Sequence, residues 1–448
     1  MNNSQAIHAS TAPAWTVPRI EANPKFSVLI VSGLASAAIP LILSLYWIGF
    51  WLAPASMGLP LRVSILGSAL FLAFLWYRAP LTHAEVNLFR VLGTAAVLLL
   101  VTTLTATGRS HAFSGWLKMV LLFVACAGVA RSLRHPATAR VFGLSLLAGA
   151  AIMGLFILFT YVRYVGFVLP SFKSAREFKG MALMLAVPLN SIAFASVFSY
   201  LSGLCLMPAS RLLVALGVPL LAISTFFTGS RAPLTILSAS IFVLLCINGL
   251  RSRWFLLQAA TALLAAAAAI GGIALLTLSP DKDLDSASEG RTHLWKAGLQ
   301  KFSERPLFGF GYESWRDDLV SRLPGEYGLT YDLAKRLGGG YHNQYISILA
   351  EQGLIGAAAA SFVIWLMLRS SWLLSFRRWA SAETHQWPLF ACLFLLLRAN
   401  FEVPGLFGYA QEPVDYLAYI FLAIVLSRFS VEEDYARSLA PRAAGWVS

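Results

Sequence analysis

Charged residues are scarce in this chain: 12% of its 448 residues are Asp, Glu, Lys or Arg, whereas a typical soluble domain carries about 25%. Hydrophobic residues reach 58%, above the roughly 45–50% of soluble domains. Acidic residues are the rarer sign, 21 against 34 basic ones, which gives a net charge of +13. Most basic residues fall in short gaps between apolar runs, as membrane topology demands. The composition therefore excludes a soluble fold, and the positive charge does not indicate a nucleic-acid partner.

Motifs of several common chemistries are also missing. The four cysteines lie in or beside apolar segments without CxxC spacing, which predicts small core residues rather than a zinc site; they are Cys126, Cys205, Cys246 and Cys392. No Walker, GxGxxG or GxSxG pattern is present, so nucleotide hydrolysis and serine esterase chemistry lack support. The polar start and the absence of a small-residue cleavage site predict that the first apolar run is retained as a helix.

Long apolar runs are what the chain has in quantity, and about twelve of them reach the roughly 20 residues that a membrane span needs. They begin near Phe26, Leu61, Val86, Phe113, Val141, Gly180, Arg211, Pro233, Trp254, Tyr345, Trp387 and Val414. The predicted fold is an all-α polytopic membrane protein. We expect nine helices in residues 1–278, an extramembrane loop at 279–341, three helices in 342–430 and a tail at 431–448.

Alternate loops are rich in Lys and Arg, which are retained on the cytoplasmic side of a membrane. This pattern predicts that both termini are cytoplasmic and that residues 279–341 face the opposite side. The long loop mixes Gly, Pro, Trp and both charge signs, and its short apolar stretches predict small helices packed on the membrane domain. A functional site is expected on this face.

Lys and Arg are expected on the cytoplasmic side, so each basic residue predicted on the external side calls for a functional or structural explanation. The candidates are Arg163, Lys173, Arg176 and Lys179 in one loop, Arg231 in a tight turn, and Arg291 in the long loop. Arginine suits a phosphate because its planar fork donates two parallel hydrogen bonds. Lys118 lies inside an apolar run, where ionisable groups tend to face a polar interior. The alternative is that these side chains reach lipid headgroups or pair with acids.

A glycine-rich string precedes the tenth predicted helix and ends in Tyr341, His342 and Asn343. His342 would lie at the external mouth of that helix, where an imidazole can act as general base because its ordinary pKa of about 6.5 is near working pH. The alternative for a single histidine is a structural role as a cap or an interfacial hydrogen-bonding group. Arg398 and Glu402 are four residues apart and are expected to pair on one helix face.

A metal site is the competing chemistry in the long loop. Asp281, Asp283 and Asp285 alternate with other residues, and oxygen clusters of this type suit Mg²⁺, Mn²⁺ or Ca²⁺. An EF-hand is excluded because Ser286 replaces its glycine and Thr292 its closing glutamate. The acidic triplet is therefore interpreted as a solvated start of the loop, and no metal or other cofactor is predicted.

Taken in order, these motifs resemble the O-antigen ligase and polymerase superfamily of bacterial polysaccharide enzymes. The likeness covers roughly residues 160–400. It is carried by the Ser230-Arg231 turn, Gly290-Arg291 with Trp295, the stretch Pro306-Leu307-Phe308-Gly309-Phe310-Gly311, and His342-Asn343 followed by Leu349, Glu351, Gly353 and Gly356.

The resemblance implies a C-type glycosyltransferase-like enzyme of the bacterial inner membrane, acting at the periplasmic face without a metal. Its substrates would be O-antigen linked to undecaprenyl diphosphate and the lipid A-core oligosaccharide, with membrane lipids around them. The family's two essential arginines match Arg231 and Arg291, and its histidine matches His342. Tyr341, Asn343, Lys118, Arg163, Arg176 and Lys179 would then bind substrate.

Two other functions remain open at this stage. A repeat-unit polymerase or a protein O-oligosaccharyltransferase would share the architecture and differ in acceptor. A lipid or polysaccharide transporter would use polar residues inside the membrane, such as Lys118 and Arg398, as a pathway. Against a transporter, the polar residues concentrate on one face and the sequence shows no paired broken helices.

Overall fold

The computed structural model describes residues 82–106, 109–134, 136–167, 189–207, 236, 239–240, 291–312, 314, 341–376, 386–400 and 413–444. Within these ranges the secondary structure is helical and no strand occurs. The helices are α3 (His83–Leu104), α4 (Arg109–Ser132), α5 (Pro136–Val165), α7 (Leu189–Leu206), α12 (Arg291–Glu304), α15 (Gln344–Phe376), α16 (Trp387–Arg398) and α17 (Pro413–Ala444).

Four of the described helices are long and apolar enough to cross a membrane. These segments are Glu85–Leu104, Ala112–Ser132, Pro136–Val165 and Gln344–Phe376. They confirm the prediction of an all-helical membrane protein as far as the described residues reach. The helix count of about twelve and the external loop stay predictions, and α17 continues past residue 430, where the tail was expected to begin.

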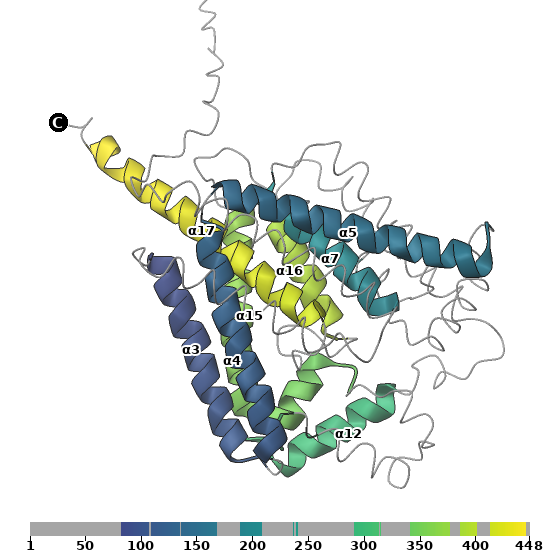
Figure 1. The fold of residues 1–448 in the computed structure, drawn as a ribbon. Coiled ribbons are helices and arrows are strands. Elements are labelled where there is room, and N and C mark those ends of the chain that lie inside the picture. Colours follow the sequence, from purple (N-terminus) through teal and green to yellow (C-terminus); the bar gives the residue numbers. More distant parts are fainter. Residues whose placement is uncertain are drawn as a thin grey trace, which may run out of the picture.

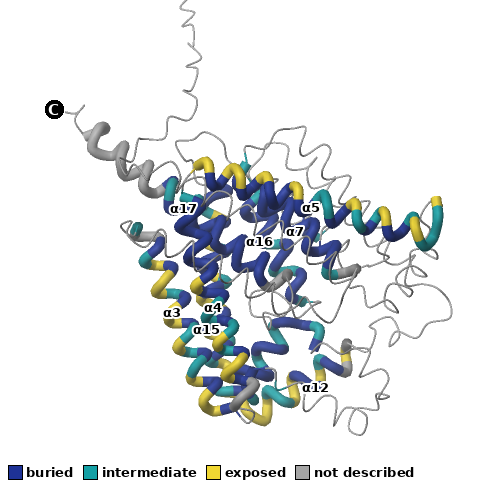
Figure 2. Tube along the Cα trace, viewed as in Figure 1, coloured by how far each residue is buried: buried dark blue, intermediate teal, exposed yellow. Residues whose placement is uncertain are grey.

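The helices form two groups around a shared core (Figure 1). α3 and α4 lie antiparallel to each other, α3 also packs against α15, and α5 pairs with α7. α17 packs against α3, α4, α7 and α15, while α16 packs against α7 and α15. Figure 2 shows that the described parts of α7 and α16 and residues 416–430 of α17 are almost wholly buried, whereas α3 and α12 keep exposed faces. The buried interior is apolar, and Cys126, Cys205 and Cys392 lie within it as the sequence predicted.

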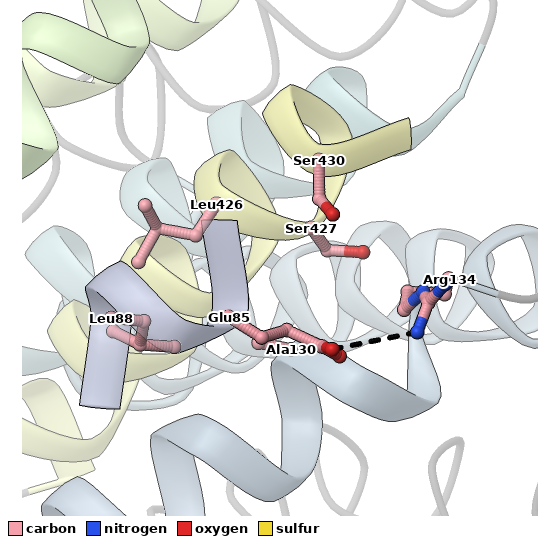
Figure 3. A pocket seen from close by; sticks show the side chains of 7 residues that line it. All are labelled: Glu85, Leu88, Ala130, Arg134, Leu426, Ser427 and Ser430. Carbon is pink, nitrogen blue, oxygen red and sulfur yellow. Dashed lines mark hydrogen bonds and ion pairs between the residues drawn. The ribbon is translucent and has the colours of Figure 1, made fainter. Parts of the chain in front are cut away.

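The bundle has two distinct ends. We call the end where α3 passes into α4, at residues 104–112, the turn end. At the opposite end Thr82 and Glu85 form a capping box that begins α3, and Glu85 pairs with Arg134 at 3.4 Å. The hydroxyl of Ser430 on α17 lies 2.9 Å from that of Thr82. A small pocket between α3, α4 and α17 lies at this end, and Glu85, Arg134 and Ser430 are among the residues that line it. Figure 3 shows the pocket and the Glu85–Arg134 contact.

α15 is not one straight helix, because it is interrupted at Gly353. A straight helix of its 33 residues would be about 50 Å long. Yet the N–H of Gln344 donates to the carbonyl of Ala399 at 2.7 Å, and the hydroxyl of Ser375 accepts from the N–H of Leu389 at 3.3 Å. Those two positions on α16 are only about 15 Å apart along the helix. The chain therefore reverses, so that residues 344–352 run to the turn end and residues 354–376 run back.

α16 is shorter than the sequence predicted for a spanning helix. Its 12 residues give a length of about 18 Å, whereas a hydrocarbon core is about 30 Å thick. Pro388 fits the first turn, where its missing N–H costs nothing, and the helix ends at Arg398. We predicted that Arg398 and Glu402 pair on one helix face. α16 ends at Arg398, and Glu402 lies outside the described residues, so this pairing stays a prediction.

Candidate functional site

Residues 306–311 bridge the break in α15. The N–H groups of Leu354 and Ile355 donate to the carbonyls of Pro306 and Leu307 at 2.8 and 3.2 Å. In the other direction, the N–H groups of Phe310 and Gly311 donate to the carbonyls of Ala350 and Glu351. Helix ends leave such groups without intrahelical partners. The loop, which we call the splint, therefore satisfies both ends of the interrupted helix.

Gly353 permits this arrangement by its backbone conformation. Its φ of 62° and ψ of −161° lie in a region that is essentially restricted to glycine. A Cβ atom there would also overlap the backbone of Leu307 and Gly309. The close approach of splint and break therefore depends on glycine at this position.

The splint also contacts the turn end of the bundle. Gly311 lies against Ala106 and Ala112, and the ring of Tyr312 packs on Gly115 of α4. Both Gly311 and Tyr312 are buried. The break at Gly353 is thus held at the turn end, and the start of α15 lies up to about 13 Å deeper in the bundle, the length of a nine-residue helix.

At this deeper position the start of α15 meets the end of α16. Asn343 is the N-cap, since its Oδ1 accepts from the N–H of Ile346 at 3.1 Å, as N-cap side chains typically do. Its Nδ2 donates to the carbonyl of Asn400 at 3.3 Å. The hydroxyl of Tyr345 donates to the carbonyl of Leu396 at 2.9 Å. Asn343 thus caps its own helix through Oδ1 and reaches the end of α16 through Nδ2. Its expected contact with substrate stays a prediction.

His342 stands immediately before this cap and is half-buried. Its φ of 49° makes it the sole non-glycine residue with positive φ in the described part of the chain. Non-glycine residues adopt this region rarely, with histidine among the more tolerant, and such conformations cluster at functional sites. Its Nδ1 atom is enclosed by the protein.

α12 covers this junction. A Cβ atom at Gly298 would overlap Ile346 and lie 2.9 Å from the ring of Tyr341, so α12 lies directly on the segment that holds His342. Tyr341 is only 2% exposed and forms the floor of this contact. Arg291 is the first residue of α12. The structure therefore brings the helix that begins with Arg291 onto the His342 segment.

A buried arginine lies at the same junction. Arg398 ends α16, is 2% exposed, and places its guanidinium 4.7 Å from the ring centre of Phe194 on α7. A cation over an aromatic face is attracted by the ring quadrupole, and a cation at a helix C-terminus is favoured by the helix dipole. Arg398 therefore ties α7 to the end of α16 that holds Asn343 and Gln344.

The other predicted site residues are distributed unevenly. Lys118 is half-buried on α4, one turn after the glycine on which Tyr312 packs. Arg163 is exposed in the last turn of α5, 5.8 Å from the ring of Tyr164, and that end of α5 projects away from α12 and α15 (Figure 1). Arg231, Arg176 and Lys179 lie outside the described residues.

The acidic triplet of Asp281, Asp283 and Asp285 also lies outside the described residues. Within the described part of the chain, no three His, Cys, Asp or Glu side chains gather as a metal site would need.

Sequence reasoning missed three features of this region. The reversal of α15 was not predicted, although Gly353 and the glycines of the splint were noted as motif residues. The capping role of Asn343 had a signal, because Asn directly before an apolar helix is a common N-cap. The contact of Arg398 with Phe194 had none, since these residues are far apart in the chain.

The described helices define a polytopic membrane protein whose polar junction lies inside the helix bundle. Residues 216–361 match the sequence model of the family described as O-Antigen ligase. This match confirms the resemblance that the motifs indicated. The matched range contains Arg231, Arg291 and His342, whereas Lys118 and Arg163 precede that range in the sequence.

A curated relative points the same way. The exopolysaccharide production protein ExoQ of Rhizobium meliloti (strain 1021) is 30% identical over 158 residues, which are 33% of this chain and 36% of that protein. The chain thus spans about a third of the length of the relative that it matches. The family model and this relative are what the chain resembles, each over about a third of its length.

Proposed function

We propose that this protein is an O-antigen ligase of the bacterial inner membrane, with its turn end and His342 facing the periplasm and both termini in the cytoplasm. It would transfer glycan from undecaprenyl diphosphate to a sugar hydroxyl of lipid A-core. The observation that supports this most is the position of His342. It has strained backbone, stands at a junction of two helix ends inside the bundle, and is covered by the helix that begins with Arg291.

The proposed reaction is one displacement. The acceptor oxygen attacks the anomeric carbon, the bond from that carbon to the diphosphate oxygen breaks, and the hydroxyl proton passes to Nε2 of His342. Arg231 and Arg291 stabilise the departing diphosphate, with Lys118, Arg163, Arg176 and Lys179 as further candidates. Fixed guanidinium groups in a site that excludes water can carry such electrostatic stabilisation without a metal. The product would have inverted anomeric configuration.

The depth of His342 suits substrates that are anchored in lipid. Irregular backbone inside a membrane protein is tolerated where it is buried in protein or lines a polar cavity. Residues 341–343 lie up to about 13 Å below the turn end, so the sugar and diphosphate groups would enter the bundle while their lipid chains stay in the bilayer.

The test is transfer of glycan from an undecaprenyl diphosphate donor to purified lipid A-core by detergent-solubilised protein in the presence of EDTA. Wild type is compared with His342→Ala and Arg231→Ala, and with Lys296→Gln as a charge-loss control. Lys296 is exposed on α12, so its variant should keep the wild-type rate. We expect product from wild type and Lys296→Gln, and a loss of at least about a hundredfold in the other two.

A second candidate is a repeat-unit polymerase, in which the acceptor is another lipid-linked glycan. The name of the relative, an exopolysaccharide production protein, favours it. Protein O-oligosaccharyltransferase activity would differ again in acceptor. Product on a lipid-linked glycan and none on lipid A-core would replace the ligase with the polymerase.

A transporter remains the rival from another class. α15 is a broken helix, a feature that transporters also use at their binding sites. Here, however, the splint fills the hydrogen-bonding positions at the break. Function that survives His342→Ala but not replacement of Arg398 would favour transport over glycosyl transfer.

A further inference from the structure

Two basic side chains at the end of α12 lie against one aromatic ring of the splint. The Nζ atom of Lys301 is 4.3 Å from the centre of the Phe310 ring, and the guanidinium carbon of Arg305 is 5.0 Å from the same centre. The N–H of Arg305 donates to the carbonyl of Lys301 at 3.3 Å, so the two residues are one helical turn apart. Each cation is attracted by the ring, whereas like charges at this spacing repel each other. Lys301 and Arg305, which we call the basic pair, are therefore held together by Phe310.

The ends of two membrane spans set the height of the basic pair. The span of α3 ends at Leu104 and that of α4 begins at Ala112, so the turn between them lies where the hydrocarbon core meets the lipid headgroups. Gly311, which follows Phe310, lies against Ala106 and Ala112. Figure 1 shows that α12 lies at this end of the bundle. Phe310 and its two cations are therefore at the level of the headgroups.

Exposed apolar side chains lie beside the basic pair. Leu307 of the splint is 55% exposed, and Leu354 of α15 is 49% exposed. The two are close to each other, since the N–H of Ile355 donates to the carbonyl of Leu307 at 3.2 Å. Cations next to exposed apolar side chains are typical of a segment that lies in a membrane interface. A soluble anion would leave these leucines in water, whereas the acyl chains of a lipid would cover them.

We propose that the basic pair binds the phosphate of an anionic phospholipid headgroup, while Leu307 and Leu354 contact its acyl chains. An arginine that stacks on a ring keeps the N–H groups at its edge available for two parallel hydrogen bonds to phosphate. Arg305 is exposed, so a headgroup can reach it. The inference requires only that α3 and α4 span the membrane, and it does not depend on the proposed reaction.

A lipid at this position would also stabilise the break in α15. The N–H of Phe310 donates to the carbonyl of Ala350 before the break, and the carbonyl of Pro306, directly after Arg305, accepts from Leu354 behind it. A headgroup held by the basic pair therefore restrains the splint that joins both segments. A ligand that binds the folded state alone raises the unfolding midpoint, so anionic lipid should make the protein more stable.

Native mass spectrometry of the full chain in a neutral detergent tests the binding. Phosphatidylglycerol and phosphatidylcholine with the same acyl chains are titrated separately, and the dissociation constant of the first bound lipid is measured. Wild type is compared with Arg305→Gln, which removes one charge of the basic pair, and with Arg305→Lys, which keeps the charge but loses the planar fork. Lys296→Gln is the matched control, because Lys296 is exposed on the same helix more than one turn before Lys301.

We expect wild type and Lys296→Gln to bind phosphatidylglycerol more tightly than phosphatidylcholine. Arg305→Gln should weaken phosphatidylglycerol binding by about fivefold, the contribution of one basic residue near an anionic surface, and should leave phosphatidylcholine binding unchanged. Arg305→Lys should lose less than Arg305→Gln. Equal losses in Arg305→Gln and Lys296→Gln would show that net charge attracts the lipid and would overturn the proposal. Equal affinity of wild type for the two lipids would also overturn it.

Thermal unfolding separates a lipid headgroup from a free phosphate. Phosphatidylglycerol should raise the midpoint of wild type and Lys296→Gln more than that of Arg305→Gln, and inorganic phosphate at the same concentration should not raise it. An equal rise with inorganic phosphate would assign the basic pair to a soluble anion and reject the lipid site. A lower lipid-free midpoint for Arg305→Gln, with unchanged lipid affinity, would show that the pair is structural.

Discussion

At the scale of single residues, the junction depends on a few backbone and side-chain choices. His342 adopts positive φ, Asn343 caps α15 and reaches Asn400, and Tyr341 forms the surface on which Gly298 rests. The shape of this short segment therefore depends on atoms within a few ångströms of His342.

Gly353→Ala tests the requirement for glycine at the break. The backbone conformation of Gly353 strongly disfavours a Cβ atom, which would also overlap Leu307. We expect a loss of about 1–3 kcal/mol or more in the free energy of unfolding, measured by thermal unfolding in detergent. Gly93→Ala is the control, since no atom lies within 4 Å of a Cβ there; it should be neutral or stabilise by up to about 1 kcal/mol. Equal stability of the two variants would contradict the prediction.

At the scale of elements, the reversal of α15 positions the junction. The first segment carries the cap to the end of α16, and the second crosses the bundle beside α3. The splint joins α12 to both segments through four backbone hydrogen bonds. Movement of α12 would therefore be transmitted to the break, and through it to His342.

Spin-label distances test the reversal directly. In a straight helix, a label at Leu349 would be farther from one at Trp372 than a label at Leu354 is, by about 7.5 Å. In the folded-back chain this difference disappears or changes sign. Double electron–electron resonance on the two pairs, with the native cysteines replaced by serine, gives the comparison. A distance from 349 to 372 that exceeds the 354 to 372 distance by the straight-helix amount would show that the chain does not reverse.

At the scale of the whole molecule, the two ends of the bundle are built from different elements. The turn end carries the splint and α12, whereas the opposite end is closed by contacts among α3, α4 and α17 around Glu85 (Figure 3). Thr82, Glu85 and Arg134 hold helices that are distant in sequence. Stability and function should therefore separate between the two ends.

Variants of Glu85 measure this separation. Glu85→Ala removes both the capping box and the pair with Arg134, and should cost about 1–3 kcal/mol of unfolding free energy. Glu85→Gln can keep the cap and should cost less. Both should keep the transfer rate per folded molecule, with exposed Glu304→Gln as the control for charge loss. A transfer rate that falls more than the folded fraction would show that the opposite end also serves the reaction.

The sequence alone determined that this is a membrane protein and that it is helical, and it predicted the segment in which we propose the site. Apolar runs and the positions of Lys and Arg are local properties, and they predicted α3, α4 and the start of α15 to within a few residues. The motif around His342 also carried the family resemblance that the comparisons confirmed.

The tertiary structure alone decided what happens at the junction. Periodicity shows that residues 344–376 are helical but not that the chain reverses at Gly353, because the reversal depends on hydrogen bonds to residues 306–311. The Nδ2 partner of Asn343 lies 57 residues away. The last turn of α5, which contains Arg163, projects away from α12 because of how α5 packs on α7 (Figure 1). Contacts between distant parts of the chain set these features, and local sequence does not encode them.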